Sequence, residues 1–546
     1  MNATAHVDTF ARDHLPPAEQ WPELIFELPE LQMPARMNAA TELLDRAIER
    51  GWGERAAILA AGGLRWTFSD LRTHANRIAR VLVEDLGLVP GNRVLLRAPN
   101  NPMVAACFFG VLKAGGIAVG SMPLLRAKEL TEIVTKAEIS HALCDARLAE
   151  DLDAARPHCP TLANVVLFGG TGASDLESRM AAKPATFADV DTAADDTCVI
   201  AFTSGTTGKP KGTMHFHRDL IAACRCWPAH TLHASSDDVF TGSPPLAFTF
   251  GMGGLLLFPL SIGASTLLVE RPAPEALLAA VAQHRATVLF TAPTSYRVMA
   301  AQAQQHDLAS LRKCVSAGEA LPAATRALWK EATGIEIIDG IGSTELFHIF
   351  ISHDEAHAKP GALGTPVAGY RACVMDDAGR PLPPGTPGRL AVKGPTGCRY
   401  LADDRQRDYV KDGWNYTGDA FLVDADGCFV YQARTDDMII SAGYNIGGPE
   451  VEGALLLHPA VSECGVIGAP DDERGQIVKA FVVLKPGHAP DAAMTTALQD
   501  FVKRAIAPYK YPRAIEYLPS LPRTETGKLQ RFRLRQMEME RQGGRE

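Results

Sequence analysis

The chain has 546 residues, of which 46% are hydrophobic and 21% are charged, and its formal net charge is −9. This composition excludes a mainly disordered chain, because there is enough apolar surface to offset the entropy lost on folding. The acidic charge balance also argues against a general nucleic-acid-binding protein.

The eleven cysteines include no Cys-x-x-Cys pair and no spacing typical of a zinc site. We therefore expect reduced, mostly buried thiols in a cytoplasmic protein. The first 17 residues have no apolar core and do not resemble a secretory signal. Residues 248–269 carry no charge, but several glycines and Pro259 interrupt them. We expect a buried helix and a strand there rather than a membrane span.

Short apolar runs alternate with helical patterns over the first 320 residues. Helices are expected over 68–86, where Thr67 and Asp70 suggest a capping box, and over 102–114. This alternation predicts an α/β fold with mostly parallel sheets. The expected strands are 57–60, 93–96, 117–120, 142–144, 165–168, 265–269, 287–290 and 313–316.

The residue pattern changes after about Gly361. Short strands separated by Pro, Gly and Asp turns predict a smaller β-rich subdomain there. From about Asp437 onward, strands such as 480–484 mix with helices such as 492–506, which predicts a compact α+β unit.

The most informative stretch runs from Ile200 to Gly212 and reads IAFTSGTTGKPKG. An apolar strand leads into a loop rich in Gly, Ser and Thr with two Lys. Backbone N–H groups, hydroxyls and ammonium groups together suit a polyphosphate. The loop is not a P-loop, because Thr203 stands where that pattern requires Gly. The alternative interpretation is a flexible surface turn.

These residues resemble the signature loop of the AMP-forming acyl-adenylate enzymes, which include acyl- and aryl-CoA ligases, luciferases and peptide-synthetase adenylation domains. The resemblance extends from about Asn38 to Arg531 through further motifs in the expected order. The ATP-binding residues that it implies in this loop are Thr203, Ser204, Gly205, Thr206, Thr207, Gly208 and Lys209.

Residues 316–321, SAGEAL, are similar to the adenine-side loop of that superfamily, although a Gly after a strand is often only a turn. The ATP-binding residues implied here are Gly318, Glu319 and Ala320.

Residues 339–345, DGIGSTE, resemble the next motif of the superfamily. Thr344 is expected to hold the α-phosphate and Glu345 to bind Mg²⁺, which takes oxygen ligands and often only one or two protein carboxylates. Asp339, Gly340 and Ile341 are expected to bind ATP, although Ile341 replaces a Tyr that often stacks on adenine. Without the resemblance, Glu345 reads as a solvated or capping carboxylate.

Residues 416–419, YTGD, resemble the ribose motif, with Asp419 accepting hydrogen bonds from both ribose hydroxyls and Arg434 adding a second contact. An isolated Gly-Asp is more often a turn. Asp436 falls at the hinge position of the superfamily. The implied organisation is an α/β N-terminal adenylation domain over 1–433 with a β-rich subdomain at about 361–433, a hinge at 434–437, and a small mobile α+β C-terminal domain over 438–546.

Residues 522–528, PRTETGK, resemble the catalytic-lysine motif. Lys528 is expected to bridge the substrate carboxylate and the phosphate during adenylation, whereas a lone Lys near a C-terminus is normally a solvated charge. In the superfamily the C-terminal domain then rotates. The residues expected to line the tunnel for the pantetheine of CoA are Ser441, Gly443 and Tyr444.

The acyl pocket is expected to be apolar. Phe248 stands where the superfamily often has a His, and a Phe there suits contact with an aromatic ring. Residues 346–350 are similar to the corresponding segment of benzoate-type CoA ligases. His348 is expected to face the ring of the substrate, and the alternative interpretation is a histidine buried in the core. The predicted pocket residues are Ala247, Phe248, Ala317, Gly342 and His348.

Residues 20–31 are similar to the openings of 2-aminobenzoate–CoA ligases. We therefore expect an aryl-acid CoA ligase that acts on 2-aminobenzoate (anthranilate) or benzoate through an aryl-AMP intermediate and releases AMP and pyrophosphate. ATP, Mg²⁺ and CoA are the expected cofactors, and aromatic compound degradation is the expected setting. We expect no nucleic-acid partner and no membrane span, and a homodimer is one oligomeric state that the sequence allows.

Two alternative functions remain open. The chain could adenylate an aryl acid and load it onto a free carrier protein. It could also be an inactive nucleotide-binding homologue, although such a protein is expected to lose the catalytic Lys or the Mg²⁺-binding Glu, and both Lys528 and Glu345 are present.

Overall fold

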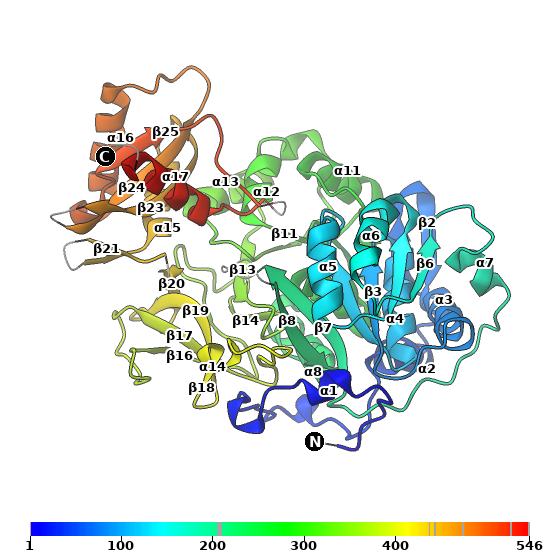
Figure 1. Ribbon diagram of the computed structural model, residues 1–546. Helices are drawn as coiled ribbons and strands as arrows, with labels where there is room; N and C mark the ends of the chain where they lie inside the picture. Colours follow the sequence, from blue (N-terminus) through cyan, green and yellow to red (C-terminus); the bar gives the residue numbers. More distant parts are fainter. Residues whose placement is uncertain are drawn as a thin grey trace.

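The computed structural model describes residues 2–204, 210–435, 437–441, 444–471, 474–524 and 527–543. In Figure 1 the α/β part, blue to green, occupies the right of the molecule. The yellow β-rich part lies at the lower left, and the orange-to-red C-terminal part lies above it. This arrangement agrees with the predicted fold class of an α/β protein with a β-rich part and a small α+β C-terminal part.

The N-terminal sheet has the strand order β6-β5-β3-β4-β7-β8. Its strands are parallel except for the last pair, in which β7 and β8 run antiparallel. The strands are β3 (Arg93–Arg97), β4 (Ile117–Ser121), β5 (His141–Asp145), β6 (Asn164–Phe168), β7 (Thr197–Ser204) and β8 (Pro210–Phe216).

The central sheet has the order β15-β14-β13-β12-β11-β9-β10-β1-β2, with a parallel core from β1 to β13 and antiparallel strands at both edges. The mostly parallel sheets predicted from the sequence are thus confirmed, and the eight expected strands coincide with β1, β3–β6 and β10–β12 to within about a residue at each end. The strands are β1 (Ala56–Ala60), β2 (Leu64–Thr67), β9 (Val239–Gly242), β10 (Ser265–Leu268), β11 (Val288–Thr291), β12 (Lys313–Ser316), β13 (Ile337–Gly342), β14 (Ile349–Ser352) and β15 (Thr365–Pro366).

Helices α3 (Phe68–Arg80) and α4 (Pro102–Lys113) connect the two α/β sheets. Both contact β1 of the central sheet, and α4 also contacts β3 and β4 of the N-terminal sheet. The two helices approach closely, because a Cβ on Gly110 would lie only 2.7 Å from the Ile78 side chain. The predicted capping box is present, since Thr67 and Asp70 exchange hydrogen bonds at the start of α3.

The β-rich sheet is antiparallel and consists of β16 (Arg371–Met375), β17 (Gly388–Lys393), β18 (Val410–Lys411), β19 (Trp414–Val423) and β20 (Phe429–Arg434). The C-terminal sheet is built on a long antiparallel pair of β23 and β24, with β25 parallel to β24. Its strands are β21 (Ile439–Ser441), β22 (Tyr444–Ile446), β23 (Val461–Asp471), β24 (Gly475–Leu484) and β25 (Ala514–Tyr517).

The remaining helices cover the sheets. Their bounds are α1 (Phe10–Asp13), α2 (Arg46–Glu49), α5 (Ala127–Lys136), α6 (Ala149–Ala155), α7 (Leu176–Ala181), α8 (His217–Arg225), α9 (Thr249–Met252), α10 (Phe258–Ser261), α11 (Pro274–His284), α12 (Pro293–Ala300), α13 (Ala323–Thr333), α14 (Gln406–Tyr409), α15 (Gly448–Leu456), α16 (Ala492–Ala505) and α17 (Arg531–Gly543).

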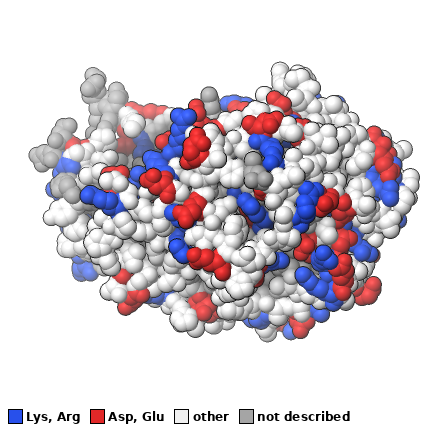
Figure 2. Space-filling view, turned by 90° about the horizontal axis from the view of Figure 1, so that it is seen from below, with Lys and Arg blue, Asp and Glu red and all other residues white. Residues whose placement is uncertain are grey.

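The uncharged stretch at 248–269 folds as α9, a π-helical turn, α10 and β10, as the glycines and Pro259 predict. Across the described part of the chain, none of the helices combines the length and apolar character needed to cross a bilayer. The cysteines are free thiols and mostly buried, which agrees with the sequence-based expectation. On the face shown in Figure 2, basic and acidic side chains are intermixed rather than segregated.

A buried ion pair links α8, which follows β8, to the segment that follows β17. Arg399 and Asp219 form a salt bridge, and both side chains are fully buried. The Arg399 guanidinium also lies 3.9 Å from the centre of the Phe216 ring. Burial raises the pKa of Asp219, and Arg399 opposes that rise. Asp219 also accepts a hydrogen bond from the Phe216 N–H at 2.8 Å, but Arg399 is the charged group that balances it in the core.

We expect Asp219→Leu to lower the free energy of unfolding by about 3–5 kcal/mol, because it leaves the Arg399 charge buried and unpaired. The double variant with Arg399→Met should recover most of that loss, since no unpaired charge remains. Urea unfolding followed by tryptophan fluorescence measures both. Equal destabilisation of the single and double variants would contradict this interpretation.

Candidate active site

The carboxyl ends of parallel strands β12 and β13 lie side by side, where open α/β sheets commonly bind ligands. Ser316, the last residue of β12, pairs with Asp339 of β13. The chain leaves β12 through Gly318, whose φ of 88° favours glycine. The predicted adenine-side loop and the predicted Asp339–Glu345 motif are therefore neighbours in space.

The predicted phosphate loop connects antiparallel strands β7 and β8. Thr203 pairs with Lys211, and Ser204 pairs with Pro210, so the loop begins and ends at one edge of the N-terminal sheet. Within the loop, Gly205, Thr206, Thr207, Gly208 and Lys209 lie outside the described residues.

Glu345 lies in the turn after β13 and is 7% exposed. Its Oε1 accepts a hydrogen bond from the Tyr400 hydroxyl at 2.5 Å and lies 3.7 Å from Lys211 Nζ. Lys211 and Tyr400 were not among the predicted site residues. Lys211 had a signal, because it ends the phosphate-loop motif, whereas one sequence gives no sign that Tyr400 reaches Glu345.

The described residues contain no group of three or more His, Cys, Asp or Glu side chains arranged to hold a metal ion. A magnesium ion bound together with a nucleotide usually takes one or two protein carboxylates plus phosphate oxygens and water. The lone carboxylate of Glu345 therefore fits Mg²⁺ that enters with ATP, and does not fit a metal held by protein ligands alone.

Asp339 is buried at the junction of β12 and β13. Burial raises its pKa to about 7, although Arg326 opposes the rise. Its Oδ1 receives no hydrogen bond from the described residues. Asp339 can thus accept or donate a hydrogen bond near neutral pH. Its neighbours Gly340 and Ile341 continue β13, and a Cβ on Gly340 would lie 2.7 Å from Ile349.

Asp419 of β19 and Arg434 of β20, the residues predicted to bind ribose, pair across the two strands. Arg434 Nη1 donates to Asp419 Oδ1 at 3.1 Å and to the carbonyl of Thr417 at 3.0 Å. A Cβ on Gly418 would lie 2.7 Å from Arg434 Nη2, so a glycine at this position lets the guanidinium pack against the turn. Burial raises the pKa of Asp419, and Arg434 opposes that rise.

Lys528 comes from the C-terminal part and lies against the loop after β12. A Cβ on Gly318 would be 3.7 Å from both Cε and Nζ of Lys528. The surrounding protein displaces water and so lowers the pKa of Lys528, while Glu319 raises that pKa. Part of the Lys528 residue is still exposed to solvent. Thr294, at the start of α12, donates a hydrogen bond to Glu319 Oε2 at 2.9 Å. The next residue, Ala320, is exposed.

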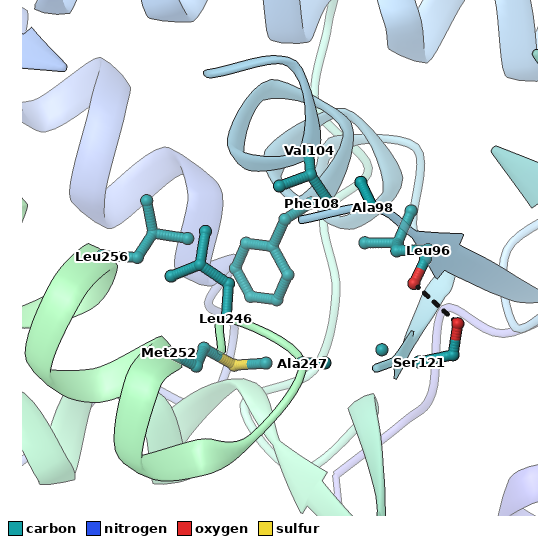
Figure 3. Close-up of a pocket in the computed structure, with 10 residues that line it drawn as sticks. Leu96, Ala98, Val104, Phe108, Ser121, Leu246, Ala247, Met252 and Leu256 are labelled. Atoms are coloured by element: carbon teal, nitrogen blue, oxygen red, sulfur yellow. Dashed lines mark hydrogen bonds between the residues drawn. The ribbon is translucent and has the colours of Figure 1, made fainter. Parts of the chain in front are cut away.

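A small apolar cavity lies between the two α/β sheets (Figure 3). Ala247, one of the residues predicted for the acyl pocket, lines this cavity, and Ser121 donates its hydroxyl proton to the Leu96 carbonyl at its edge. Asn100, which the sequence did not single out, fixes this wall by donating to the Pro244 carbonyl at 2.9 Å and accepting from the Leu246 N–H at 2.8 Å. The other lining residues are Leu96, Ala98, Val104, Phe108, Gly120, Leu246, Met252 and Leu256.

His348 lies in an aromatic cluster beside this region rather than in the lining of the cavity. Its ring is within 6 Å of the rings of Trp227, Phe250 and Phe258. Its Nε2 faces the Phe250 carbonyl at 3.3 Å, whereas its buried Nδ1 has no hydrogen-bond partner in the described residues. Burial lowers the pKa of His348 to about 3, so the ring is neutral.

The other predicted pocket residues occupy several environments. Ala317 is buried behind the loop after β12, Phe248 is half-buried before α9, and Gly342 is exposed at the end of β13. Gly342 lies against the His348 backbone, since a Cβ on it would be 2.6 Å from the His348 carbonyl oxygen. Of the five predicted pocket residues, Ala247 is the one that lines the described cavity.

Two of the predicted CoA-tunnel residues, Ser441 of β21 and Tyr444 of β22, pair across these antiparallel strands. Ser441 is buried and accepts a hydrogen bond from Arg474 Nε at 3.3 Å. Tyr444 is 53% exposed and stacks on Tyr509 at 4.5 Å between ring centres. Gly443 and the predicted hinge residue Asp436 lie outside the described residues.

We expect His348 to make the protein less stable in acid. Its folded pKa of about 3 lies below the value of about 6.5 for an unfolded histidine, so protonation favours the unfolded state. The contribution of neutral His348 to the free energy of unfolding is complete above pH 6.5. It falls by about 1.4 kcal/mol for each pH unit of acidification toward pH 3. Urea unfolding between pH 7 and 4.5 should show a shallower pH dependence for His348→Leu; an unchanged slope would contradict the buried, neutral state.

Comparisons with known proteins identify the family of the chain. The family model described as AMP-binding enzyme matches residues 44–400, and the one described as AMP-binding enzyme C-terminal domain matches residues 450–528. A benzoate–CoA ligase of Thauera aromatica is 35% identical over 93% of this chain and 97% of the relative. A 4-hydroxybenzoate–CoA/benzoate–CoA ligase of Rhodopseudomonas palustris is 32% identical over 92% of this chain and 95% of the relative.

Solved structures give the same picture. An anthranilate CoA ligase in complex with anthranoyl-AMP matches with a TM-score of 0.89 and 36% identity, covering 94% of this chain and 99% of that chain. A benzoate CoA ligase from Burkholderia xenovorans matches with a TM-score of 0.83 and 32% identity, covering 91% and 100%. Since the first family model spans more than half of the sequence, the chain belongs to the AMP-binding enzyme family.

Proposed function

We propose that this protein is an ATP-dependent aryl-acid CoA ligase that acts on benzoate or 2-aminobenzoate. The observation that carries the proposal is the position of Lys528, which reaches from the C-terminal part to Gly318 at the end of β12. The names of the related ligases for benzoate and of the anthranilate ligase support the choice of an aryl acid and of CoA.

In the first step the substrate carboxylate attacks the α-phosphorus of ATP, and the bond to pyrophosphate breaks. Two anions must meet, so the site has to neutralise charge and hold geometry. Lys528 bridges the carboxylate and the α-phosphate, and Thr344 holds the α-phosphate. When bound at Glu345, Mg²⁺ offsets the charge that develops on pyrophosphate.

The remaining residues of the predicted nucleotide site bind and orient ATP. The loop at 203–209 takes the β- and γ-phosphates, and Asp419 with Arg434 takes the ribose. The residues proposed to surround the adenine are Gly318, Glu319, Ala320, Asp339, Gly340 and Ile341.

In the second step the CoA thiolate attacks the carbonyl carbon of aryl-AMP. A carbon–sulfur bond forms, and the carbon–oxygen bond to AMP breaks. We propose that the C-terminal domain, 438–546, first rotates on the 434–437 hinge at Asp436 against the domain at 1–433. Rotation withdraws Lys528 and brings Ser441, Gly443 and Tyr444 to the channel for CoA.

We propose that Ala247, Phe248, Ala317, Gly342 and His348 form the acyl pocket. An apolar, aromatic wall suits a flat ring. Neutral His348, whose Nδ1 lacks a partner among the described residues, is suited to a hydrogen bond with a polar ring substituent such as a 2-amino group.

The free thiols favour a reducing, cytoplasmic setting. The same substrate choice suits a role in aromatic compound degradation.

A pyrophosphate-release screen tests this function. The substrates are benzoate, its amino and hydroxy derivatives, cinnamates and short fatty acids, each with ATP and then with CoA or a carrier protein. We expect the highest turnover with benzoate or 2-aminobenzoate, and transfer to CoA. Maximal turnover on an aliphatic acid would refute the aromatic pocket, and transfer only to the carrier protein would replace the CoA-ligase proposal.

In the same assay, Lys528→Ala should slow pyrophosphate release about 10²–10³-fold, because a charge-stabilising contact is lost at the reacting phosphate. Its reaction of chemically prepared aryl-AMP with CoA should stay near the wild-type rate, since Lys528 has left the site by then. An undiminished rate of aryl-AMP formation would contradict the role of Lys528.

We further expect Glu319 to keep Lys528 protonated. The rate of aryl-AMP formation should fall as pH rises through the Lys528 pKa, which lies below that of an ordinary lysine. Glu319→Gln removes the negative charge that raises this pKa, so the fall should move to lower pH. Thr294→Val, which frees the Glu319 side chain, should give a smaller shift in the same direction. If kcat/KM of Glu319→Gln falls at the same alkaline pH as in the wild type, Glu319 does not control the protonation of Lys528.

A further inference from the structure

The segment 398–401, which the sequence did not connect with the site, is fixed against β8. The Met214 N–H donates to the Arg399 carbonyl, and the Leu401 N–H donates to the Gly212 carbonyl, both at 2.8 Å. Between these bonds Tyr400 pairs with Thr213 in an antiparallel bridge. Side chains alternate along an extended segment, so this pairing sends Tyr400 and Arg399 to opposite sides.

The Tyr400 hydroxyl lies between a cation and an anion. Lys211 Nζ donates to it at 3.0 Å, and it donates in turn to Glu345 Oε1 at 2.5 Å. Lys211 Nζ also lies 5.0 Å from the centre of the Tyr400 ring. Three side chains from separate parts of the chain thus meet through one hydroxyl group.

Burial makes this contact strong and fixes its direction. Tyr400 is 1% exposed and Glu345 is 7% exposed, so water competes little for either group. A carboxylate has only acceptor atoms and an ammonium group has only donors, so the Tyr400 hydroxyl accepts from Lys211 and donates to Glu345.

The hydrogen bond occupies one oxygen of the carboxylate. Glu345 Oε2 receives no hydrogen bond from the residues that the structure describes. A fixed Oε1 restricts rotation of the carboxylate and leaves Oε2 for an incoming cation. Outer contacts of this kind orient metal-binding carboxylates and typically change metal affinity 10–100-fold when removed.

We propose that Tyr400 is a positioning residue, held by Lys211 and β8, that orients the Glu345 carboxylate for the Mg²⁺ that enters with ATP. The proposal rests on the proposed function, since it assigns a metal-binding role to Glu345. It also links the strand that leaves the phosphate loop directly to the metal-binding carboxylate. The two parts of the site that hold the triphosphate are thereby aligned before the nucleotide binds.

The test measures metal binding without turnover. Free Mn²⁺, used in place of Mg²⁺, is titrated by electron paramagnetic resonance into the full chain with ATP and no acid. Tyr400→Phe keeps the ring and removes the hydroxyl. We expect it to weaken Mn²⁺ binding to the ATP complex about tenfold, as for loss of a hydrogen bond to a charged group. Unchanged Mn²⁺ affinity would overturn the proposal.

Tyr409→Phe is the matched control. Tyr409 is buried beside Tyr400 at 5.8 Å between ring centres, and its hydroxyl faces Ser343 Oγ at 3.2 Å rather than Glu345. We expect this variant to bind Mn²⁺ like the wild type. Equal weakening in both Phe variants would mean that Tyr400 only supports the packing of this region.

A double-mutant cycle with Glu345→Gln separates positioning from packing. If Tyr400 acts through the carboxylate, Tyr400→Phe should change Mn²⁺ affinity no further once Glu345 is Gln. Additive losses would contradict the proposal. Thermal unfolding of each variant identifies misfolded protein.

A further variant removes a hydrogen bond to the Tyr400 backbone and leaves its hydroxyl group in place. Gln406 Oε1 accepts the Tyr400 N–H at 2.9 Å, and Gln406→Leu removes that support without touching the hydroxyl. Weaker Mn²⁺ binding in this variant supports the proposal, and wild-type binding opposes it. If the wild type itself releases no pyrophosphate with any acid and shows no ATP-dependent Mn²⁺ binding, the proposed function fails rather than the role of Tyr400.

Discussion

The antiparallel pairing of β7 with β8 is the constraint on which the site depends. It holds both ends of the phosphate loop at one sheet edge, and the outer side of β8 then pairs with 398–401. Through that second pairing, Lys211 of β8 and Tyr400 reach Glu345, which belongs to the turn after β13 of the other α/β sheet. A single strand thus ties the N-terminal sheet to the central sheet at the place where a nucleotide would bind.

Burial and charge are balanced differently at each ionisable group of the site. The Asp339 pKa rises to about 7 because no cation lies close enough to outweigh burial. Glu345 is also buried, but it has a hydroxyl donor and a nearby ammonium group. His348 is surrounded by aromatic rings and stays neutral. Lys528 differs from all of these, since it comes from the C-terminal part of the chain and lies against the Gly318–Glu319 loop.

Local patterns predicted most of the secondary structure. Buried strands such as β3 and β12 are short apolar runs bounded by turn residues, and α3 begins at a capping box that needs only Thr67 and Asp70. The motifs also assigned Asp419 and Arg434 to one predicted contact, and the two residues lie opposite each other on adjacent strands of one antiparallel sheet. Asn100, Lys211 and Tyr400 could not be placed in this way. Each acts on a group more than fifty residues away in the sequence.

The sequence by itself determined the elements, the fold class and the family, because hydrophobic period, capping residues and the phosphate-loop motif are local properties of the chain. Only the tertiary structure decided which side chains meet. It brought Lys528 to Gly318, Tyr400 to Glu345 and His348 into an aromatic cluster outside the lining of the small cavity. Those contacts depend on the pairing of distant strands and on how two sheets pack across α3 and α4, which no local pattern specifies.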